Sequence, residues 1–309
     1  LGKRALCDLG ERGASPPLEG GGFAALGTEI DCVSGFACVL GCCRRQPAGM
    51  SQPALRDLLN VATEAAYLAG RRTLAYFNAG VDVEDKPDQS PVTVADREAE
   101  DVCRATISRW FPDHTITGEE RADRRGNDDY TWIIDPIDGT KSFIHGVPLY
   151  GVLIGCLVRG TPSVGVIYLP ALDEMIDAAE GMGCRWNGRT ARCSDVRRIE
   201  DATILAGSIT RAMERSDAFA DLASRCKLNR GWGDAFGYAL VATGRADLML
   251  DPRILPWDCA PMPVIMREAG GWSGNWNGQQ DIHGDDWLAV APGIREEVLA
   301  TLQKHPTRP

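Results

Sequence analysis

The sequence predicts a layered fold of the α/β class, in part of α+β character, and three patterns in its 309 residues predict it. Two long helical patterns come first, between residues 53 and 111. Apolar strands joined by short turns follow between residues 149 and 193, which indicates an antiparallel meander. After residue 195, strand and helix patterns alternate, as they do in α/β proteins. The composition, 44% apolar and 25% charged, is typical of a globular protein.

The first helix is predicted to start at Pro53 and to close at Gly80, because apolar residues recur at intervals of three and four over 55–69. A polar, turn-rich loop is expected at 85–91. The second helix is predicted from about Asp96 to Phe111. Its expected inward residues are Ala99, Val102, Ile107 and Trp110.

The apolar run 132–134 predicts a short buried strand. It should end at Asp135-Pro136, because proline lacks the N–H that a strand ladder needs. The charged segment 121–129 in front of it is expected to be a mobile loop. The strands of the meander are predicted at Leu149–Val158, Ser163–Leu169 and Met175–Ala179, followed by a hairpin-like piece at 181–193.

The last third of the chain predicts strands at 203–206, 246–250 and 287–290, and helices at 216–225, 234–243, 258–269 and 294–303. We therefore expect two halves, 50–195 and 196–309, with site residues drawn from both. Residues 1–49 are rich in glycine and cysteine and show no sustained periodicity. We expect them to be a disordered or non-native extension with no share in the fold.

The formal net charge of −10, without any block rich in lysine and arginine, argues against a nucleic-acid-binding protein. No apolar run reaches the length of a membrane span. Five of the 11 cysteines fall within residues 1–49 and the others are scattered singly, which suits a reducing compartment, so we expect a cytoplasmic protein. A homodimer is the expected assembly, since dimers are the commonest soluble oligomers.

The stretch 132–141 carries the densest set of chemical groups. Asp135 and Asp138 lie three residues apart on a stiff turn and should face one spot. The amides of Gly139 and Thr140 then open a short helix, and a helix N-terminus attracts anions. Carboxylates beside such amides indicate a divalent metal together with a phosphate. A plain turn between strand and helix explains the proline and the glycine equally well.

Two further acids could complete such a site. Glu119 follows an expected strand and Asp258 begins an expected helix, and carboxylate oxygens are ligands that Mg²⁺ prefers. Each has a simpler interpretation, because Glu119 and Glu120 could be a solvated pair and Asp258 a helix N-cap. Together, the four acids could hold two ions that activate water and stabilise a leaving oxygen.

Four motifs, in this order, resemble the inositol monophosphatase superfamily of Mg²⁺-dependent phosphatases, and the resemblance covers nearly all of 50–305. They are the lysine-to-aspartate loop 86–96, Gly-Glu-Glu at 118–120, WIIDPIDGTKSF at 132–143 and WDCAP at 257–261.

The resemblance implies an αβαβα sandwich and a phosphatase that binds two or three Mg²⁺ ions and acts on a small phosphate ester. It implies that Asp96 and Thr140 orient the attacking water, that Glu119 helps to activate it, and that the amides of Gly139 and Thr140 bind the phosphate. Lys86 would lie near the site. Helix capping is the alternative role for Asp96 and Thr140. The implied metal ligands are Glu119, Asp135, Asp138, Asp258 and the main-chain carbonyl of Ile137.

The segment 231–252 resembles the histidinol-phosphate phosphatase branch, which implies L-histidinol phosphate as the substrate. Its amine and imidazole can both be cationic, and Asp234 and Asp251 would bind them. A helix N-cap and a strand-end turn are the alternatives for these two aspartates. Lys141 does not separate this branch from the phosphoadenosine-phosphatase-like branch.

Other functions remain open beside histidinol phosphate hydrolysis. An inositol 1-phosphate phosphatase or a broad sugar or nucleotide phosphatase is the alternative within the family, and a catalytically silent binding paralogue is the alternative outside it. We expect Arg253 to be a surface residue. His114 and His283 are expected to be incidental, because a metal site can protonate the leaving group without histidine.

Overall fold

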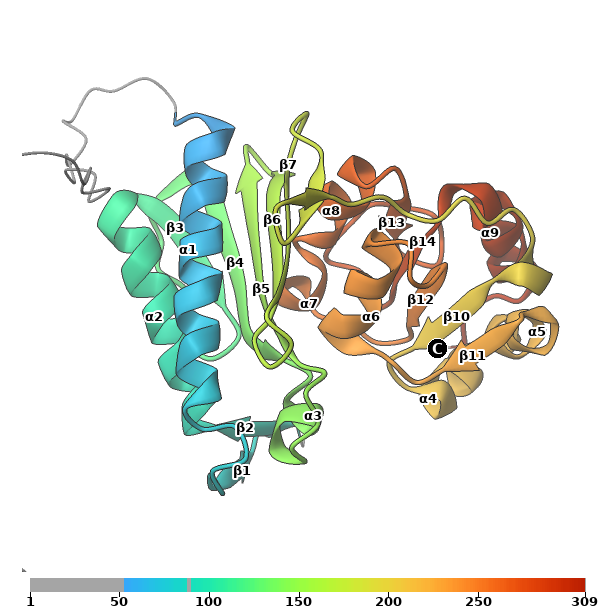
Figure 1. The fold of residues 1–309 in the computed structure, drawn as a ribbon, viewed down its shortest axis with the longest axis horizontal. Helices are drawn as coiled ribbons and strands as arrows, with labels where there is room; N and C mark the ends of the chain where they lie inside the picture. Colours follow the sequence, from blue (N-terminus) through green and yellow to red (C-terminus); the bar gives the residue numbers. More distant parts are fainter. Residues whose placement is uncertain (1–52, 88–89, 309) are drawn as a thin grey trace, which may run out of the picture. The chain divides into compact units, whose positions relative to one another are not determined.

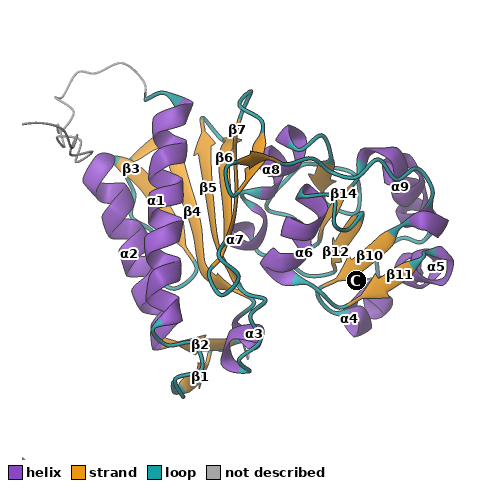
Figure 2. Cartoon of the chain, viewed as in Figure 1, coloured by secondary structure: helices purple, strands orange, loops and turns teal. Residues whose placement is uncertain are grey.

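The computed structural model describes residues 53–87 and 90–308, all within one compact unit, Arg45–Pro309 (Figure 1). The expectation for residues 1–49 therefore lies outside the described residues. Within this unit, helices and two sheets alternate in layers, which confirms the αβαβα sandwich (Figure 2). No helix in the described part of the chain is both long and apolar enough to span a membrane.

The first layer consists of α1 (Leu55–Leu74) and α2 (Val94–Trp110), which pack on one face of a seven-stranded sheet. The end of the first helix was predicted too late, since α1 stops at Leu74 and turns lead to Gly80. The inward position of Trp110 was also wrong. Its side chain is 37% exposed at the end of α2 and its indole N–H donates to Glu64 across the helix surface.

Both ends of the loop predicted at 85–91 belong to strands, since β1 (Val83–Asp85) pairs with β2 (Pro91–Thr93). The seven-stranded sheet runs in the order β3-β4-β5-β6-β7-β8-β9. β3 and β4 are parallel and every later pair is antiparallel, so the predicted meander is confirmed. Its strands are β3 (His114–Gly118), β4 (Asn127–Asp138), β5 (Gly151–Val158), β6 (Thr161–Leu169), β7 (Glu174–Ala179), β8 (Cys184–Trp186) and β9 (Arg189–Thr190).

The central strand β4 is longer than predicted at both ends. It begins at Asn127, inside the segment expected to be a mobile loop, and it continues through Pro136 to Asp138. Asp135 pairs with Leu153 and Asp138 with Gly151, so β4 uses three steps where β5 uses two. The extra residue is a β-bulge, which tolerates the missing N–H of proline within a strand. The short helix α3 (Thr140–Ile144) follows as predicted.

The second sheet has five strands in the order β11-β10-β12-β14-β13. The strands β10 (Thr203–Ala206), β12 (Leu248–Asp251) and β14 (Trp287–Val290) were predicted closely. The short elements α4 (Ile209–Arg215), β11 (Leu228–Arg230) and β13 (Trp272–Gly274) were missed, because so few residues give no clear period. Two single-turn 3₁₀ helices lie at Ile199–Asp201 and Pro292–Ile294.

The helices of the second half form two layers. α6 (Asp234–Ala242), α7 (Pro256–Cys259) and α8 (Met262–Glu268) pack between the two sheets, while α5 (Asp217–Arg225) and α9 (Arg295–Lys304) cover the far face of the second sheet. The single helix predicted at 258–269 is thus two helices, with Pro261 between them. Proline lacks an N–H, so it favours such an interruption.

Candidate metal and phosphate site

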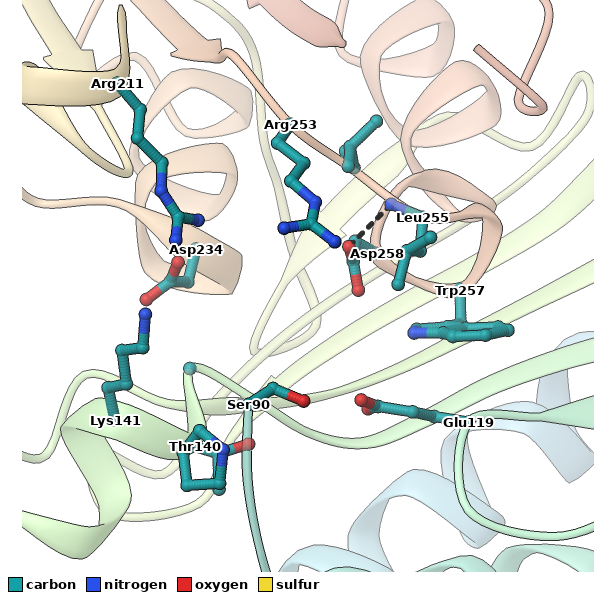
Figure 3. Close-up of a pocket in the computed structure, with 13 residues that line it drawn as sticks. Ser90, Glu119, Thr140, Lys141, Arg211, Asp234, Arg253, Leu255, Trp257 and Asp258 are labelled. Carbon is teal, nitrogen blue, oxygen red and sulfur yellow. Dashed lines mark hydrogen bonds between the residues drawn. The ribbon is translucent and has the colours of Figure 1, made fainter. Parts of the chain in front are cut away.

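A pocket opens where the end of β3, the β4–α3 turn and the starts of α6 and α7 converge (Figure 3). Most of its wall is polar, and acidic and basic side chains both contribute to it. The lining residues are Ser90, Pro91, Glu119, Gly139, Thr140, Lys141, Arg211, Asp234, Arg253, Ile254, Leu255, Trp257 and Asp258.

Three carboxylates meet at the floor of this region. Asp135, Asp138 and Asp258 each offer one oxygen atom, and these atoms all lie within 4.8 Å of one another. In a regular strand, side chains three residues apart point to opposite faces. The bulge in β4 adds one residue and so brings Asp135 and Asp138 to the same side. The prediction that both carboxylates face one spot is therefore confirmed, but a β-bulge brings them together and not a turn.

Asp258 reaches the cluster from the other half of the chain. It lies in α7, and its Oδ2 accepts a hydrogen bond of 2.8 Å from the backbone N–H of Leu255. The capping role weighed for this aspartate is therefore present, although Asp258 stands within the first turn and not at the N-cap. Capping and membership of the acid cluster coexist in one carboxylate.

Glu119 completes the acidic wall at the end of β3. Its Oε1 accepts a hydrogen bond of 2.6 Å from Lys86 Nζ, and its side chain is only 17% exposed, so it is not half of a solvated pair. The same ammonium group also donates to Glu120. Burial works to lower the pKa of Lys86, but the hydrogen bonds to the two glutamates outweigh it and raise that pKa. Lys86 thus lies at the site as a permanent cation.

The carboxylates repel one another. Burial, reinforced by neighbouring carboxylates, raises the pKa of Asp135 and Asp138 well above the usual range, and raises that of Glu119 to about 7. Burial likewise raises the pKa of Asp258 to about 6. Asp138 Oδ2 is buried and has no hydrogen-bond partner. Clustered hard oxygen donors with an unsatisfied oxygen fit a divalent cation such as Mg²⁺.

Asp96 and Thr140 lie beside the acid cluster. Asp96 Oδ2 accepts from the N–H of Thr93 at 2.8 Å and from its hydroxyl at 2.6 Å, which makes the capping box of α2. Its other oxygen, Oδ1, lies 3.5 Å from Thr140 Oγ1. The single hydroxyl proton of Thr140 has two acceptors in reach, the nearer being the carbonyl of Ile137 at 3.0 Å and the other Asp96 Oδ1. Asp96 therefore caps a helix with one oxygen and turns the other toward Thr140.

Gly139 stands at the N-cap of α3 with φ of +87°. A Cβ atom there would lie 3.2 Å from the carbonyl oxygen of Leu149 and 3.2 Å from a carboxylate oxygen of Asp234. Glycine is thus required both by the left-handed conformation and by the close approach. The tight turn keeps the start of α3 open to the pocket. The Ile137 carbonyl lies at the same turn, and its role as a metal ligand stays a prediction.

The two candidate substrate contacts differ in position. Asp234, the first residue of α6, lines the pocket, and Lys141 and Arg211 point toward its carboxylate (Figure 3). Asp251 is buried behind the wall, where Tyr238 donates a hydrogen bond of 2.7 Å to it, and it is not among the lining residues. Burial and Asp234 raise the pKa of Asp251 to about 8.

Several pocket residues were missed by the sequence analysis. Arg211 lies on α4, a helix that the sequence did not reveal. Arg253 is exposed, as expected, but it lines the pocket, and its guanidinium points toward Asp258 (Figure 3). Trp257 also lines the pocket, and its indole nitrogen is buried without a hydrogen-bond partner. The motif that identified Asp258 contains this tryptophan, so a signal for it was available.

The two histidines do not line the pocket. His114 is buried, stacked between Phe111 and Tyr130, and accepts a hydrogen bond from Trp132. Burial lowers its pKa to about 4. His114 is therefore a core residue that stays neutral.

Comparison with known proteins identifies the arrangement. The model of the inositol monophosphatase family matches residues 54–307, nearly all of the described chain. The chain belongs to the inositol monophosphatase family. Phosphatases of this family act on small phosphate esters and are generally metal-dependent, and the acid cluster of Asp135, Asp138 and Asp258 agrees with that dependence.

Individual family members differ in their names. A histidinol-phosphatase from Chlorobaculum parvum is 41% identical over 236 residues, which covers 75% of this chain and 91% of that protein. A histidinol-phosphatase from Mycobacterium tuberculosis is 35% identical over 254 residues, covering 80% and 98%. The solved structure of the IMPase from Thermotoga maritima superimposes with a TM-score of 0.74 at 31% identity, covering 80% and 97%. The chain is similar to both kinds of phosphatase.

Proposed function

We propose that this chain is a Mg²⁺-dependent phosphomonoesterase that hydrolyses L-histidinol phosphate to L-histidinol and phosphate, a step of histidine biosynthesis. The observation that carries the proposal is the carboxylate of Asp234, which stands in the pocket wall so near the start of α3 that a Cβ atom at Gly139 would lie 3.2 Å from it. The names of the two histidinol-phosphatase relatives support it.

The proposed ligands for two or three Mg²⁺ ions are Glu119, Asp135, Asp138, Asp258 and the carbonyl of Ile137. When bound, Mg²⁺ supplies Lewis-acid activation of water and neutralises charge on the phosphate. Phosphoryl transfer needs this neutralisation and accurate positioning more than covalent chemistry. The protein's own contribution is to place the reacting groups.

The attacking water is oriented by Thr140 and Asp96 in this proposal. Thr140 Oγ1 accepts a hydrogen bond from the water and turns its single hydroxyl proton from the Ile137 carbonyl, 3.0 Å away, toward Asp96 Oδ1 at 3.5 Å. Glu119 helps to take up the proton that the water loses. The amides of Gly139 and Thr140 bind the phosphate at the start of α3. Lys86 holds Glu119 in place through its 2.6 Å hydrogen bond.

Asp234 is the proposed contact for the leaving group. Histidinol carries an amine and an imidazole, and both can be cationic near neutral pH. Asp234 adopts φ of +53°, a conformation that an L-residue holds only at a cost. Strain of this kind gathers at functional sites, which supports a role for the side chain. Asp251 would act from behind Asp234 as a buried, hydrogen-bonded support of the wall and not as a charge, since its pKa is raised to about 8.

One observation favours the alternative substrates. Lys141 and Arg211 both point toward Asp234, so the wall that would receive a cationic leaving group also carries two cations (Figure 3). A neutral polyol, as in inositol 1-phosphate or a sugar phosphate, meets no such repulsion. A catalytically silent paralogue is disfavoured, because all four candidate metal acids are present and grouped around the pocket.

The test is a parallel assay of Mg²⁺-dependent phosphate release. Histidinol phosphate, inositol 1-phosphate, fructose 1,6-bisphosphate and 3′-phosphoadenosine 5′-phosphate are compared, with a simple aryl phosphate as a generic ester. We expect the highest kcat/KM with histidinol phosphate. Asp234→Asn should lower kcat/KM for histidinol phosphate at least tenfold and leave the generic ester within about twofold. A preference for another substrate, or equal losses on both esters, would overturn the proposal.

Two further elements of the proposal concern the protein in its cell. We place it in the cytoplasm, since the six cysteines of the described chain are all free thiols, as a reducing compartment would keep them. We propose a homodimer as its assembly. Sedimentation of the purified protein tests the assembly.

A further inference from the structure

A buried glutamate lies directly behind the loop that carries Glu119. Glu100, on α2, has a fully buried side chain and does not line the pocket. Its Oε2 accepts a hydrogen bond of 2.6 Å from the backbone N–H of Glu120. Its Oε1 accepts from the N–H of Arg121 at 3.2 Å and from Nε of Arg104 at 2.6 Å. One carboxylate therefore binds two successive amides just after Glu119.

The same carboxylate touches the residue before Glu119. A Cβ atom at Gly118 would lie 2.3 Å from Glu100 Oε1, so only glycine admits the carboxylate at this distance. The N–H of Glu119 itself donates to the carbonyl of Ile134 at 3.2 Å, which ties it to β4. The backbone of Glu119 is thus held from both sides, and Glu100 contributes the support from α2.

This support depends on the geometry of the buried carboxylate and its three donors. An ionised carboxylate without partners is very costly to bury, and here two amides and a guanidinium provide the partners. If the loop after β3 moved, two of these hydrogen bonds would be lost inside the protein. A buried charged group that loses its partners costs more than a neutral one. The hydrogen bonds to Glu100 therefore fix the conformation of this loop and, with it, the position of the Glu119 backbone.

We infer that Glu100 is a positioning residue for the metal site: it fixes the main chain around Glu119 so that the Glu119 carboxylate stands at the acid cluster before the metal binds. The inference rests on the proposed role of Glu119 as a metal ligand. It does not depend on which phosphate ester is the substrate.

The test compares two glutamates that support backbone amides in the same way. Glu268 accepts hydrogen bonds from the amides of Gly181 at 2.9 Å and Gly183 at 2.7 Å, far from the pocket lining. Mg²⁺ binding to Glu100→Gln and Glu268→Gln is measured by titration calorimetry without substrate, together with the melting temperature. We expect both variants to lose stability, and only Glu100→Gln to bind Mg²⁺ at least tenfold more weakly. Equal Mg²⁺ affinities in the two variants would overturn the inference.

A double variant shows whether Glu100 acts through Glu119. We expect Glu119→Gln to weaken Mg²⁺ binding, and Glu100→Gln to add less than twofold in the Glu119→Gln background, because coupled residues are not additive. Full additivity would overturn the positioning role. Unchanged Mg²⁺ binding in Glu119→Gln alone would instead refute Glu119 as a ligand, so the two failures are distinguishable.

If Glu100→Gln does not fold, Arg104→Gln decides the question. Arg104 binds Glu100 and also donates to the carbonyl of Arg121 at 3.1 Å, so its loss loosens the same loop while both amide hydrogen bonds remain. We expect about threefold weaker Mg²⁺ binding. An unchanged affinity would overturn the inference.

Discussion

Asp96 Oδ1 lies 3.5 Å from Thr140 Oγ1, although 44 residues separate the two along the chain. Asp96 belongs to α2 and Thr140 is the first residue of α3. The second oxygen of Asp96 is occupied by two hydrogen bonds from Thr93. One oxygen of this carboxylate caps a helix and the other is free for the proposed catalytic role, so the two roles can be tested separately.

We expect Asp96→Asn to lower kcat by roughly 10²–10⁴, the range typical of side chains that assist proton transfer, because an amide is a poorer acceptor for the Thr140 hydroxyl. Thr93→Ala is the control, since it removes the hydroxyl that donates to Oδ2 and accepts from the N–H of Ala95, while the backbone N–H of residue 93 still holds Oδ2 and Oδ1 stays beside Thr140. It should cost about 1 kcal/mol of stability, as the loss of a helix cap does, while kcat falls by less than about tenfold. Steady-state kinetics and urea unfolding measure the two effects. Similar losses of kcat in both variants would mean that Asp96 serves the fold alone.

Asp138 is predicted to destabilise the metal-free protein although activity requires it. Its carboxylate is buried among other acids, and Oδ2 has no hydrogen-bond partner. In the absence of metal, Asp138→Asn should therefore raise the melting temperature by a few degrees, because it removes a buried like charge. The same change should abolish turnover and the stabilisation by Mg²⁺. Melting curves with chelator and with Mg²⁺ measure both, with exposed Asp82→Asn as the control. A lower melting temperature for metal-free Asp138→Asn would contradict this account.

The layers of the fold could be predicted because both sheets are buried on two faces. Trp132 and Ile134 pack in the core with residues of α1 and α2, while Ile133 belongs to the core on the opposite face, with residues of α6, α7 and α8. Such strands consist of continuous apolar runs, which can be recognised in the sequence alone. The bulge in β4 could not be predicted in this way. It depends on how Asp135 and Asp138 pair with β5, and pairing is a property of two strands together.

The site residues also differ in whether the sequence alone could reveal them. The motif residues Glu119, Asp135, Asp138 and Asp258 could be named from the sequence because their chemistry and order are distinctive. Glu100 could not, because a glutamate on an amphipathic helix with neighbouring charges resembles a solvent-exposed residue. Only the packing of α2 against the loop after β3 reveals that Glu100 is buried and bound to the amides of Glu120 and Arg121.

His114 should make the protein sensitive to acid. The ring centroids of Phe111 and Tyr130 lie 4.6 and 4.5 Å from that of His114, and Trp132 donates to Nδ1 at 3.0 Å. Burial lowers the pKa of His114 from 6.5 to about 4, so the unfolded chain binds a proton in this range and the folded chain does not. His114 therefore lowers the free energy of unfolding as the pH drops from 6.5 to 4, by up to roughly 3 kcal/mol, whereas the buried site carboxylates, whose pKa values are raised, act in the opposite direction.

Urea unfolding at several pH values between 7 and 4.5 measures this effect. His114→Phe removes one titrating group, so the variant should lose less stability than the wild type as the pH falls over this range. The variant should also be less stable at pH 7, because the Trp132 N–H loses its acceptor. The exposed His283→Phe is the control and should keep the wild-type slope. A wild-type slope in His114→Phe would show that another group causes the acid sensitivity.

The strained backbone at Asp234 allows its effect on stability to be tested separately from its proposed role in substrate binding. Asp234 and Asp173 are both aspartates with φ of +53°, but only Asp234 lines the pocket. Glycine adopts this conformation without the steric cost that an L-residue pays, about 1 kcal/mol, although it also gains entropy in the unfolded chain. Asp234→Gly and Asp173→Gly should therefore change the melting temperature by similar small amounts.

Only Asp234→Gly should affect the choice of substrate. Without the carboxylate, kcat/KM for histidinol phosphate should fall at least tenfold, since a cationic leaving group loses its counter-charge and meets Lys141 and Arg211 alone. The generic aryl phosphate should be hydrolysed at the wild-type rate, because it makes no use of this wall. Asp173→Gly should leave both activities unchanged. If Asp234→Gly kept the wild-type kcat/KM for histidinol phosphate, Asp234 would be a structural residue. The cations Lys141 and Arg211 would then favour a neutral polyol phosphate over histidinol phosphate as the substrate.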